Sequence, residues 1–161
     1  NDKIMTHGID QIPLSNYFQR LFDECSPDGY CVGFSDAYRR KDLFPSSHHV
    51  ALGAKYKEAF SIDDDWATEL KKVHTFGVKN MSDDMWGLDE IYSSRILKNR
   101  ADVSFVSDMF FKFVVPNRLD RSGNLTPNLE KLKRGGYSEI HCPRPYHANK
   151  SLIDSIVNEI L

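Results

Sequence analysis

The stretch "KIMTHGIDQIPLSNYF", from Lys3 to Phe18, joins an apolar-leaning run to an amphipathic segment through a single acid. Ile4 to Ile9 predicts a strand, and residues 12–24 ("IPLSNYFQRLFDE") predict a helix with Ser15 as its N-cap. Asp10 then follows the strand. In open α/β sheets ligands bind beyond the carboxyl ends of strands, where an aspartate can hold a divalent cation against a phosphorylated substrate. The alternative interpretation of Asp10 is a turn residue or helix cap.

Strand and helix patterns alternate along the rest of the chain. Aromatic and β-branched runs predict strands at 30–34 ("YCVGF"), 103–107 ("VSFVS") and 137–142 ("YSEIHC"). Helical spacing predicts helices at 50–60, 63–73, 88–99 and 151–161. In the second of these, Asp63 or Asp64 is the expected cap, and Trp66, Leu70 and Val73 share one stripe. This order predicts an α/β domain.

Composition limits the function classes. The chain has 161 residues, 40% of them hydrophobic and 12% aromatic, which predicts one globular domain over residues 1–161. Its 21 basic and 23 acidic side chains give a net charge of -2, so we expect no nucleic-acid partner. No apolar run is long enough to span a bilayer, and no secretion signal is present at the start. We therefore expect a soluble, cytoplasmic protein.

Three cysteines, Cys25, Cys31 and Cys142, lack the spacing of a zinc site. They are interpreted as buried, reduced thiols of a cytosolic protein. The alternative is a thiol protease in which Cys31 is the nucleophile and His141 its base.

Four segments, read in order, carry a family resemblance. They are "GIDQIPLSNYFQRLF" (8–22), "GFSDAYRRKDLFPSSHHVALGAKYKEAF" (33–60), "WGLDEIYSSRILKN" (86–99) and "SEIHCPRPYHANKSL" (138–152). Together they resemble the C-terminal, metal- and acceptor-binding portion of a GT-A glycosyltransferase. The resemblance covers nearly the whole chain and implies a mixed sheet flanked by helices, without part of the N-terminal half that normally binds the nucleoside. It also implies that the chain can be a fragment of a longer glycosyltransferase domain.

The resemblance implies a metal site. Asp10 looks like an acid of the DxD-type motif, and His141 like the late histidine that completes the shell of Mn²⁺ or Mg²⁺. Gly8 stands where a second acid is common. Since a lost carboxylate removes both charge and a ligand, either His7 or water substitutes for it, or the activity is metal-independent.

The resemblance also implies substrate-binding residues. Small side chains in residues 44–53, with Ser46, Ser47 and His48, are similar to the segment that lines the donor sugar. In the alternative, the serines cap a helix and both His48 and His49 are exposed. The other substrate-binding candidates are Asp36, Trp86 (against a sugar ring), Arg144 (on a leaving diphosphate) and Lys150.

Asp89 and Glu90 match the acidic pair that serves the acceptor. An attacking hydroxyl must lose a proton, which a nearby carboxylate can accept. Acids are also common in the first turn of any helix, because they oppose the helix dipole.

The function implied is metal-assisted transfer of a sugar, of hexosyltransferase type, from a nucleotide-sugar to a carbohydrate or another hydroxyl acceptor. One alternative is an ADP-ribosyltransferase-like toxin or phage-defence protein that uses NAD, with Glu139 as its catalytic acid. A second alternative is a carbohydrate-binding module without catalysis.

Overall fold

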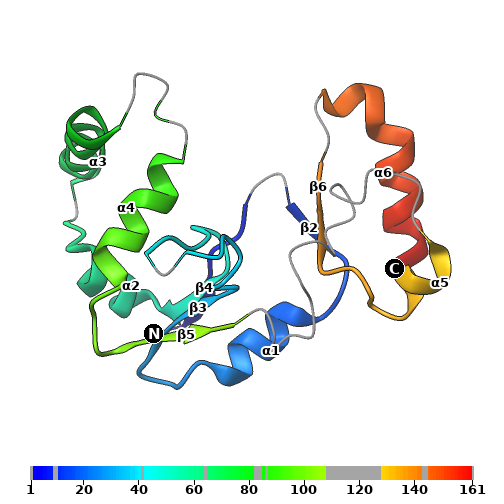
Figure 1. Ribbon diagram of the computed structural model, residues 1–161, viewed down its shortest axis with the longest axis horizontal. Helices are drawn as coiled ribbons and strands as arrows, with labels where there is room; N and C mark the ends of the chain where they lie inside the picture. The colour runs from blue at the N-terminus through cyan, green and yellow to red at the C-terminus, as the bar shows by residue number, and fades with distance from the viewer. Residues whose placement is uncertain are drawn as a thin grey trace. The chain divides into compact units, whose positions relative to one another are not determined.

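The computed structural model describes residues 2–8, 11–40, 42–63, 65–81, 85, 87–107, 128–142 and 145–160. The chain forms two compact units. The first comprises Asn1–Thr6 and Leu21–Ser107, and the second His7–Arg20 and Asp108–Leu161. Six helices and six strands lie among the described residues, which confirms the predicted α/β class and mixed sheet (Figure 1). Both units lie within the range predicted as one domain.

The first unit is built on a four-stranded sheet. Its strands are ordered β1 (Lys3–Met5), β4 (His49–Leu52), β3 (Tyr30–Gly33) and β5 (Val103–Val106). β4 is antiparallel to both of its neighbours, whereas β3 and β5 are parallel. A parallel pair needs a long crossover, which here contains β4 and three helices.

β3 is buried along its whole length, and its side chains alternate between two faces. Tyr30 and Val32 join a core cluster with Ala51 and Leu97. On the other face, a Cβ atom at Gly33 would lie 2.8 Å from Leu21 Cδ2. Gly33 therefore permits the close approach of the last turns of α1 (Tyr17–Glu24), the helix that begins in the second unit's residues and ends in the first's.

Three helices complete the first unit: α2 (Gly53–Phe60), α3 (Trp66–Asn80) and α4 (Leu88–Leu97). α4 packs against both α2 and α3. The cap of α3 is Asp65, whose carboxylate accepts hydrogen bonds from two backbone N–H groups, so the expected cap at Asp63 is wrong, and Asp64 lies outside the described residues. The expected apolar stripe of α3 is not a core face, because Trp66 and Leu70 are 74% and 50% exposed.

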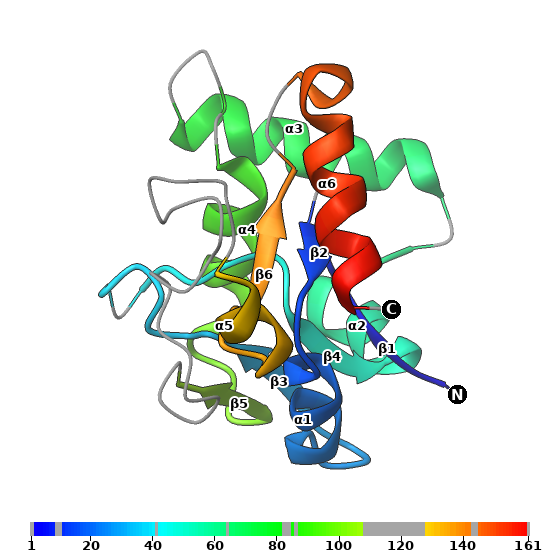
Figure 2. The same cartoon turned by 90° about the vertical axis from the view of Figure 1, so that its right-hand side faces the viewer.

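The second unit contains a two-stranded antiparallel pair, β2 (Gln11–Pro13) and β6 (Glu139–His141). Two helices, α5 (Leu129–Lys133) and α6 (Tyr146–Ile160), pack with it, and α6 runs alongside the pair (Figure 2). The apolar face of α6 is confirmed at Ile153 and Ile156, which are 3% and 1% exposed.

The structure corrects several predicted elements. Residues 50–52, predicted as the start of a helix, belong to β4, and Ile12 and Pro13 belong to β2 rather than to α1. Ser15 is not the N-cap of α1, because its buried hydroxyl has no hydrogen-bond partner. The predicted strands at 30–34, 103–107 and 137–142 are confirmed as β3, β5 and β6. Among the described helices, none is long and apolar enough to cross a membrane.

Candidate functional site

The strand pair of the second unit separates apolar from polar side chains. Ile12 pairs with Ile140, and both pack into the core beside α6. The flanking pairs are Gln11 with His141, and Pro13 with Glu139. Because paired residues share a face and neighbouring residues alternate, Gln11, Glu139 and His141 project from the face opposite the core. The register thus brings together polar groups that lie 130 residues apart in sequence.

Glu139 is the centre of a cluster of polar side chains, formed with Gln11 and His141, which we call the polar group. The residue is only 4% exposed, and its two carboxylate oxygens receive different donors. Tyr17 Oη donates to Oε2 at 3.1 Å, and Gln11 Nε2 donates to Oε1 at 3.3 Å. A buried carboxylate is costly unless it is paired and hydrogen-bonded, so these donors stabilise it.

Two imidazoles flank the same carboxylate. His7 Nε2 lies 3.8 Å from Glu139 Oε2, and His141 Nε2 lies 3.6 Å from Oε1. His141 also contacts the side-chain amide of Gln11. Both histidines are partly exposed, with 24% and 31% of their side-chain surfaces accessible, so a ligand from solution can reach them.

Tyr17 links the carboxylate to one of these imidazoles. Its hydroxyl is 2.8 Å from His7 Nε2 and donates to Glu139. Burial, together with the charge and hydrogen bond of Glu139, raises the pKa of Tyr17 far above its ordinary value. Tyr17 therefore stays protonated at physiological pH and acts as a donor that fixes the orientation of the carboxylate.

The donor set of this polar group suits a divalent cation. A carboxylate and imidazoles are ligands for Mn²⁺ and other first-row metals. Two ligand atoms bonded at about 2.1 Å to one ion, at angles of about 90 to 120°, lie about 3.0 to 3.6 Å apart. The distances from Glu139 to His7 and to His141 are close to this spacing, so Glu139 with either histidine can supply two ligands.

The predicted metal ligands fall on this part of the chain. His141 belongs to the polar group, and His7, expected as a substitute ligand, lies beside Glu139. Asp10 lies outside the described residues, but Gln11 follows it directly and contacts His141. From the sequence, Glu139 was predicted as a site residue only in the NAD-dependent alternative, and Gln11 and Tyr17 were not predicted. The spacing of Glu139 and His141 within "SEIHC", which puts both on one face of a strand, was the available signal.

The predicted acidic pair lies in the first turn of α4, in the first unit. Asp89 accepts a hydrogen bond from the hydroxyl of Ser46, so two predicted site residues that are 43 positions apart meet. Glu90 accepts a hydrogen bond from the Tyr38 hydroxyl. Each carboxylate is thus oriented by a hydroxyl group from the segment that follows β3.

Ser47, His48 and Asp36 also lie in the first unit. Ser47 Oγ is 3.0 Å from His48 Nδ1, and the ring of His48 packs edge-on against Phe34. His48 and His49 are 4% and 2% exposed and no helix begins at these serines, so the alternative with exposed histidines is wrong. Asp36 accepts hydrogen bonds from Ser35 and Ser107 and lines a cavity of about 350 Å³.

The remaining predicted site residues are Lys150, Trp86, Arg144 and Cys31. Lys150 lies on α6 in the second unit, where its ammonium group is paired with Asp154. Trp86 and Arg144 lie outside the described residues. Cys31 is fully buried, and its hydrogen bond with Cys25 and its burial raise the pKa of its thiol. Because the thiolate is the nucleophile, this environment disfavours the thiol-protease alternative.

The chain matches no protein-family model, no curated protein and no solved structure. The likeness to GT-A glycosyltransferases therefore stays a prediction from the four ordered segments.

Proposed function

We propose that this chain is the metal- and acceptor-binding part of a glycosyltransferase that moves a sugar from a nucleotide-sugar to a hydroxyl acceptor. The observation that carries the proposal is the register of β2 and β6. It pairs Gln11, the residue directly after Asp10, with His141. The two segments expected to share a metal are thus neighbours, although nothing in their sequence separation requires it.

In the second unit, His141 and Glu139 would hold the cation together with the expected ligand Asp10, and His7 is the alternative to His141. When bound, Mn²⁺ or Mg²⁺ supplies positive charge that stabilises the departing diphosphate. The protein's part is to keep the ligands oriented. Tyr17 and Gln11 do so, since each donates a hydrogen bond to a different oxygen of Glu139. Such contacts around metal ligands typically matter for both affinity and activity.

In the first unit, Glu90 and Asp89 are the proposed acceptor-binding residues. Glu90 is half-buried and bonded to Tyr38, whereas Asp89 is exposed and bonded to Ser46. An ionised carboxylate at either position can accept the proton of an attacking hydroxyl. Ser46 and Tyr38 hold the two carboxylates in place and offer hydroxyl groups to a sugar.

The NAD-dependent alternative has less support. It requires Glu139 to act on a substrate directly, but only 5% of its side-chain surface is accessible, and each oxygen already accepts a hydrogen bond. This environment suits a carboxylate that holds a cation or positions its neighbours. In the other alternative, a carbohydrate-binding module without catalysis, the chain would bind sugar but turn over no donor. The turnover assay below distinguishes this alternative from a transferase.

The test measures release of nucleoside diphosphate from UDP-, GDP-, CDP- and dTDP-sugars, each with and without Mn²⁺. We expect one donor to be consumed only with the metal, and Asp10→Ala and His141→Ala to lose this activity. Loss of even an outer-shell partner of a metal costs about 10- to 100-fold, so a ligand should cost at least that much. The matched control is Asp28→Ala, which removes an exposed acid from a turn. Unchanged turnover by the Asp10 variant, or cleavage of NAD that depends on Glu139, would refute the proposal.

Binding of Mn²⁺ alone gives a second readout that does not depend on finding the donor. Electron paramagnetic resonance of free Mn²⁺ should show weaker binding in Glu139→Gln and in His141→Ala than in the Asp28→Ala control. Equal binding by all of these proteins would remove the metal from the proposal.

A further inference from the structure

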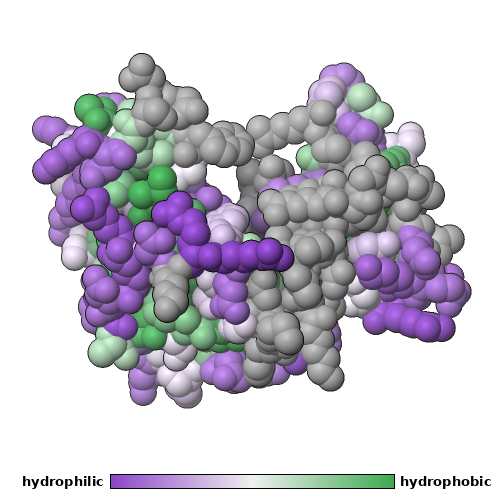
Figure 3. All heavy atoms as spheres, viewed as in Figure 1, coloured by the Kyte–Doolittle hydropathy of each residue, from purple (hydrophilic) through white to green (hydrophobic). Residues whose placement is uncertain are grey.

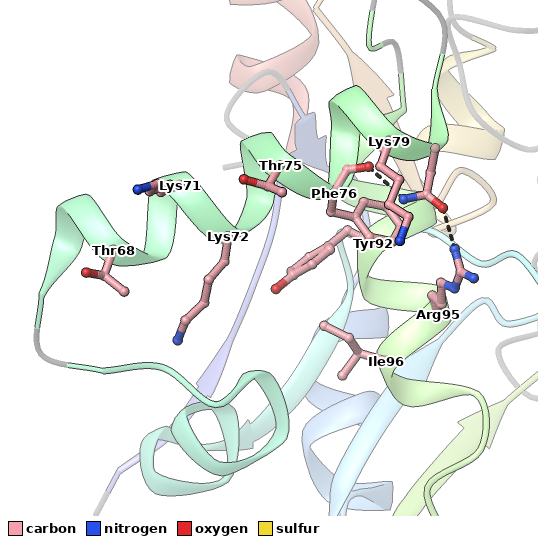
Figure 4. Close-up of a pocket in the computed structure, with 10 residues that line it drawn as sticks. Thr68, Lys71, Lys72, Thr75, Phe76, Lys79, Tyr92, Arg95 and Ile96 are labelled. Atoms are coloured by element: carbon pink, nitrogen blue, oxygen red, sulfur yellow. Dashed lines mark hydrogen bonds between the residues drawn. The ribbon is translucent and has the colours of Figure 1, made fainter.

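An open groove between α3 and α4 of the first unit has a volume of about 700 Å³ and contains none of the residues assigned above (Figure 4). Residues of α3 from Thr68 to Asn80 form one wall. Tyr92, Arg95 and Ile96 of α4 form the other. A volume of this size is in the range of small-molecule sites.

The charge of the groove is one-sided. Lys71, Lys72, Lys79 and Arg95 line it, and among the described residues no carboxylate does. The chain as a whole has a net charge of -2, so this concentration of positive charge is local. Hydrophilic side chains cover much of the first unit in the view of Figure 3. A concave site lined by one sign of charge attracts ligands of the opposite sign.

The four cations differ in how far they are neutralised. Lys72 pairs with Glu69 at 2.8 Å and with Asp63 at 3.0 Å, so its charge is compensated inside the unit. Arg95 donates to the amide oxygen of Asn80 at 2.7 Å, and this partner is neutral, so among the described residues no carboxylate compensates its positive charge. Within the part of the chain that the structure describes, Lys71 and Lys79 form no ion pair.

The floor of the groove is aromatic. The rings of Phe76 and Tyr92 lie edge-to-face with centroids 5.1 Å apart, between the two helices (Figure 4). The guanidinium carbon of Arg95 lies 5.6 Å from the centre of the Phe76 ring. Both rings are only partly buried, so a flat ligand can pack against them, and the guanidinium group of Arg95 is held against Phe76.

We propose that this groove binds a small aromatic phosphate ester. The phosphate lies between Lys79 and Arg95, since a guanidinium group presents paired donors to phosphate oxygens and an ammonium group adds charge. The aromatic part of the ligand packs on Phe76 and Tyr92. This site is independent of the proposed glycosyltransferase function, because it shares no residue with the polar group around Glu139 or with the acidic pair.

The experiment is a titration of the ¹⁵N-labelled chain with phenyl phosphate, followed by amide chemical shifts. We expect the largest shifts in α3 and α4. Parallel titrations with inorganic phosphate and with phenol separate the charge from the ring, and each should bind at least about fivefold more weakly than phenyl phosphate. Shifts confined to other elements, absence of shifts at millimolar ligand, or equal binding of inorganic phosphate would overturn the proposal.

A variant of Lys79 tests whether this lysine binds the phosphate. Lys79→Gln removes an exposed charge and should weaken phenyl phosphate binding by up to about fivefold, the upper end of the range expected for one exposed ion pair. The matched control is Lys98→Gln, which removes an exposed lysine just beyond the end of α4 and outside this groove. If both variants bind phenyl phosphate as tightly as the unaltered chain, the assignment is wrong. Failure of every nucleotide-sugar in the turnover assay leaves this outcome unaffected.

Discussion

His49 makes the stability of the first unit depend on pH. Its imidazole is 2% exposed, with Nδ1 3.1 Å from the Tyr30 hydroxyl and Nε2 2.9 Å from the carbonyl oxygen of Pro45. These contacts fit a neutral ring that donates from Nε2 and accepts at Nδ1. Burial lowers the pKa of His49 from 6.5 to about 4.

The sign and size of the effect follow from the two protonation states. As the pH falls below 6.5, His49 takes up a proton in the unfolded chain but stays neutral in the folded one. The folded state therefore loses stability between pH 6.5 and about 4. One pH unit well below the unfolded pKa corresponds to about 1.4 kcal/mol, so lowering the pH from 7.5 to 5.0 should cost about 2 kcal/mol.

The assay is urea unfolding, followed by circular dichroism, of the unaltered chain and of His49→Gln at several pH values between 7.5 and 5.0. Glutamine does not titrate, and contributions of all other groups cancel in the difference between the two proteins. We expect the stability advantage of histidine over glutamine to shrink by about 2 kcal/mol across this range. A difference in unfolding free energy that stays constant with pH would refute the reasoning.

Three further substitutions test a buried hydrogen bond, the packing of the core and a helix cap. Tyr17→Phe removes a donor to a buried carboxylate and should lower the free energy of unfolding by about 1.5 to 3 kcal/mol, whereas Tyr146→Phe, at a half-exposed ring, should change it by less than about 0.5 kcal/mol. Leu97→Ala empties a fully buried position in the first core and should cost about 2 to 5 kcal/mol; Ile91→Ala, at a 36% exposed position of the same helix, should cost clearly less in the same urea titration. Asp65→Ala removes the cap of α3 and should cost about 1 kcal/mol, read as a lower thermal midpoint; an unchanged midpoint would mean that the cap contributes nothing.

Local pattern was enough for elements whose residue types and spacing are typical of a strand or a helix within a short window of sequence. β3 and β5 are compact β-branched and aromatic runs, and α4 and α6 show helical spacing, so all four were predicted. β4 was missed because its residues run directly into the helical pattern of α2. Its extended state depends on pairing with β1 and β3 at once, which a local window does not contain.

The candidate site, too, was predicted only in part. His141 was predicted from its order in the chain, and His7 from the absence of an acid at Gly8. The association of Glu139 with Tyr17 was not predicted, because Tyr17 follows the helical spacing of a core residue and the β2–β6 register is a contact between distant segments. Nothing in "QIP" distinguishes the strand β2 from the entry of a helix.

The pairing of β2 with β6 also sets the order in which the protein can fold during synthesis. Gln11 emerges from the ribosome 130 residues before His141, and translation adds about 5 to 20 residues per second, so β2 waits roughly 7 to 26 s for its partner. The strands β3, β4 and β5 of the first unit are synthesised in this interval, after β1. The polar group around Glu139 therefore forms only after all strands of the first unit have been made, and β2 is an unpaired strand edge, open to other nascent chains, until β6 has been made.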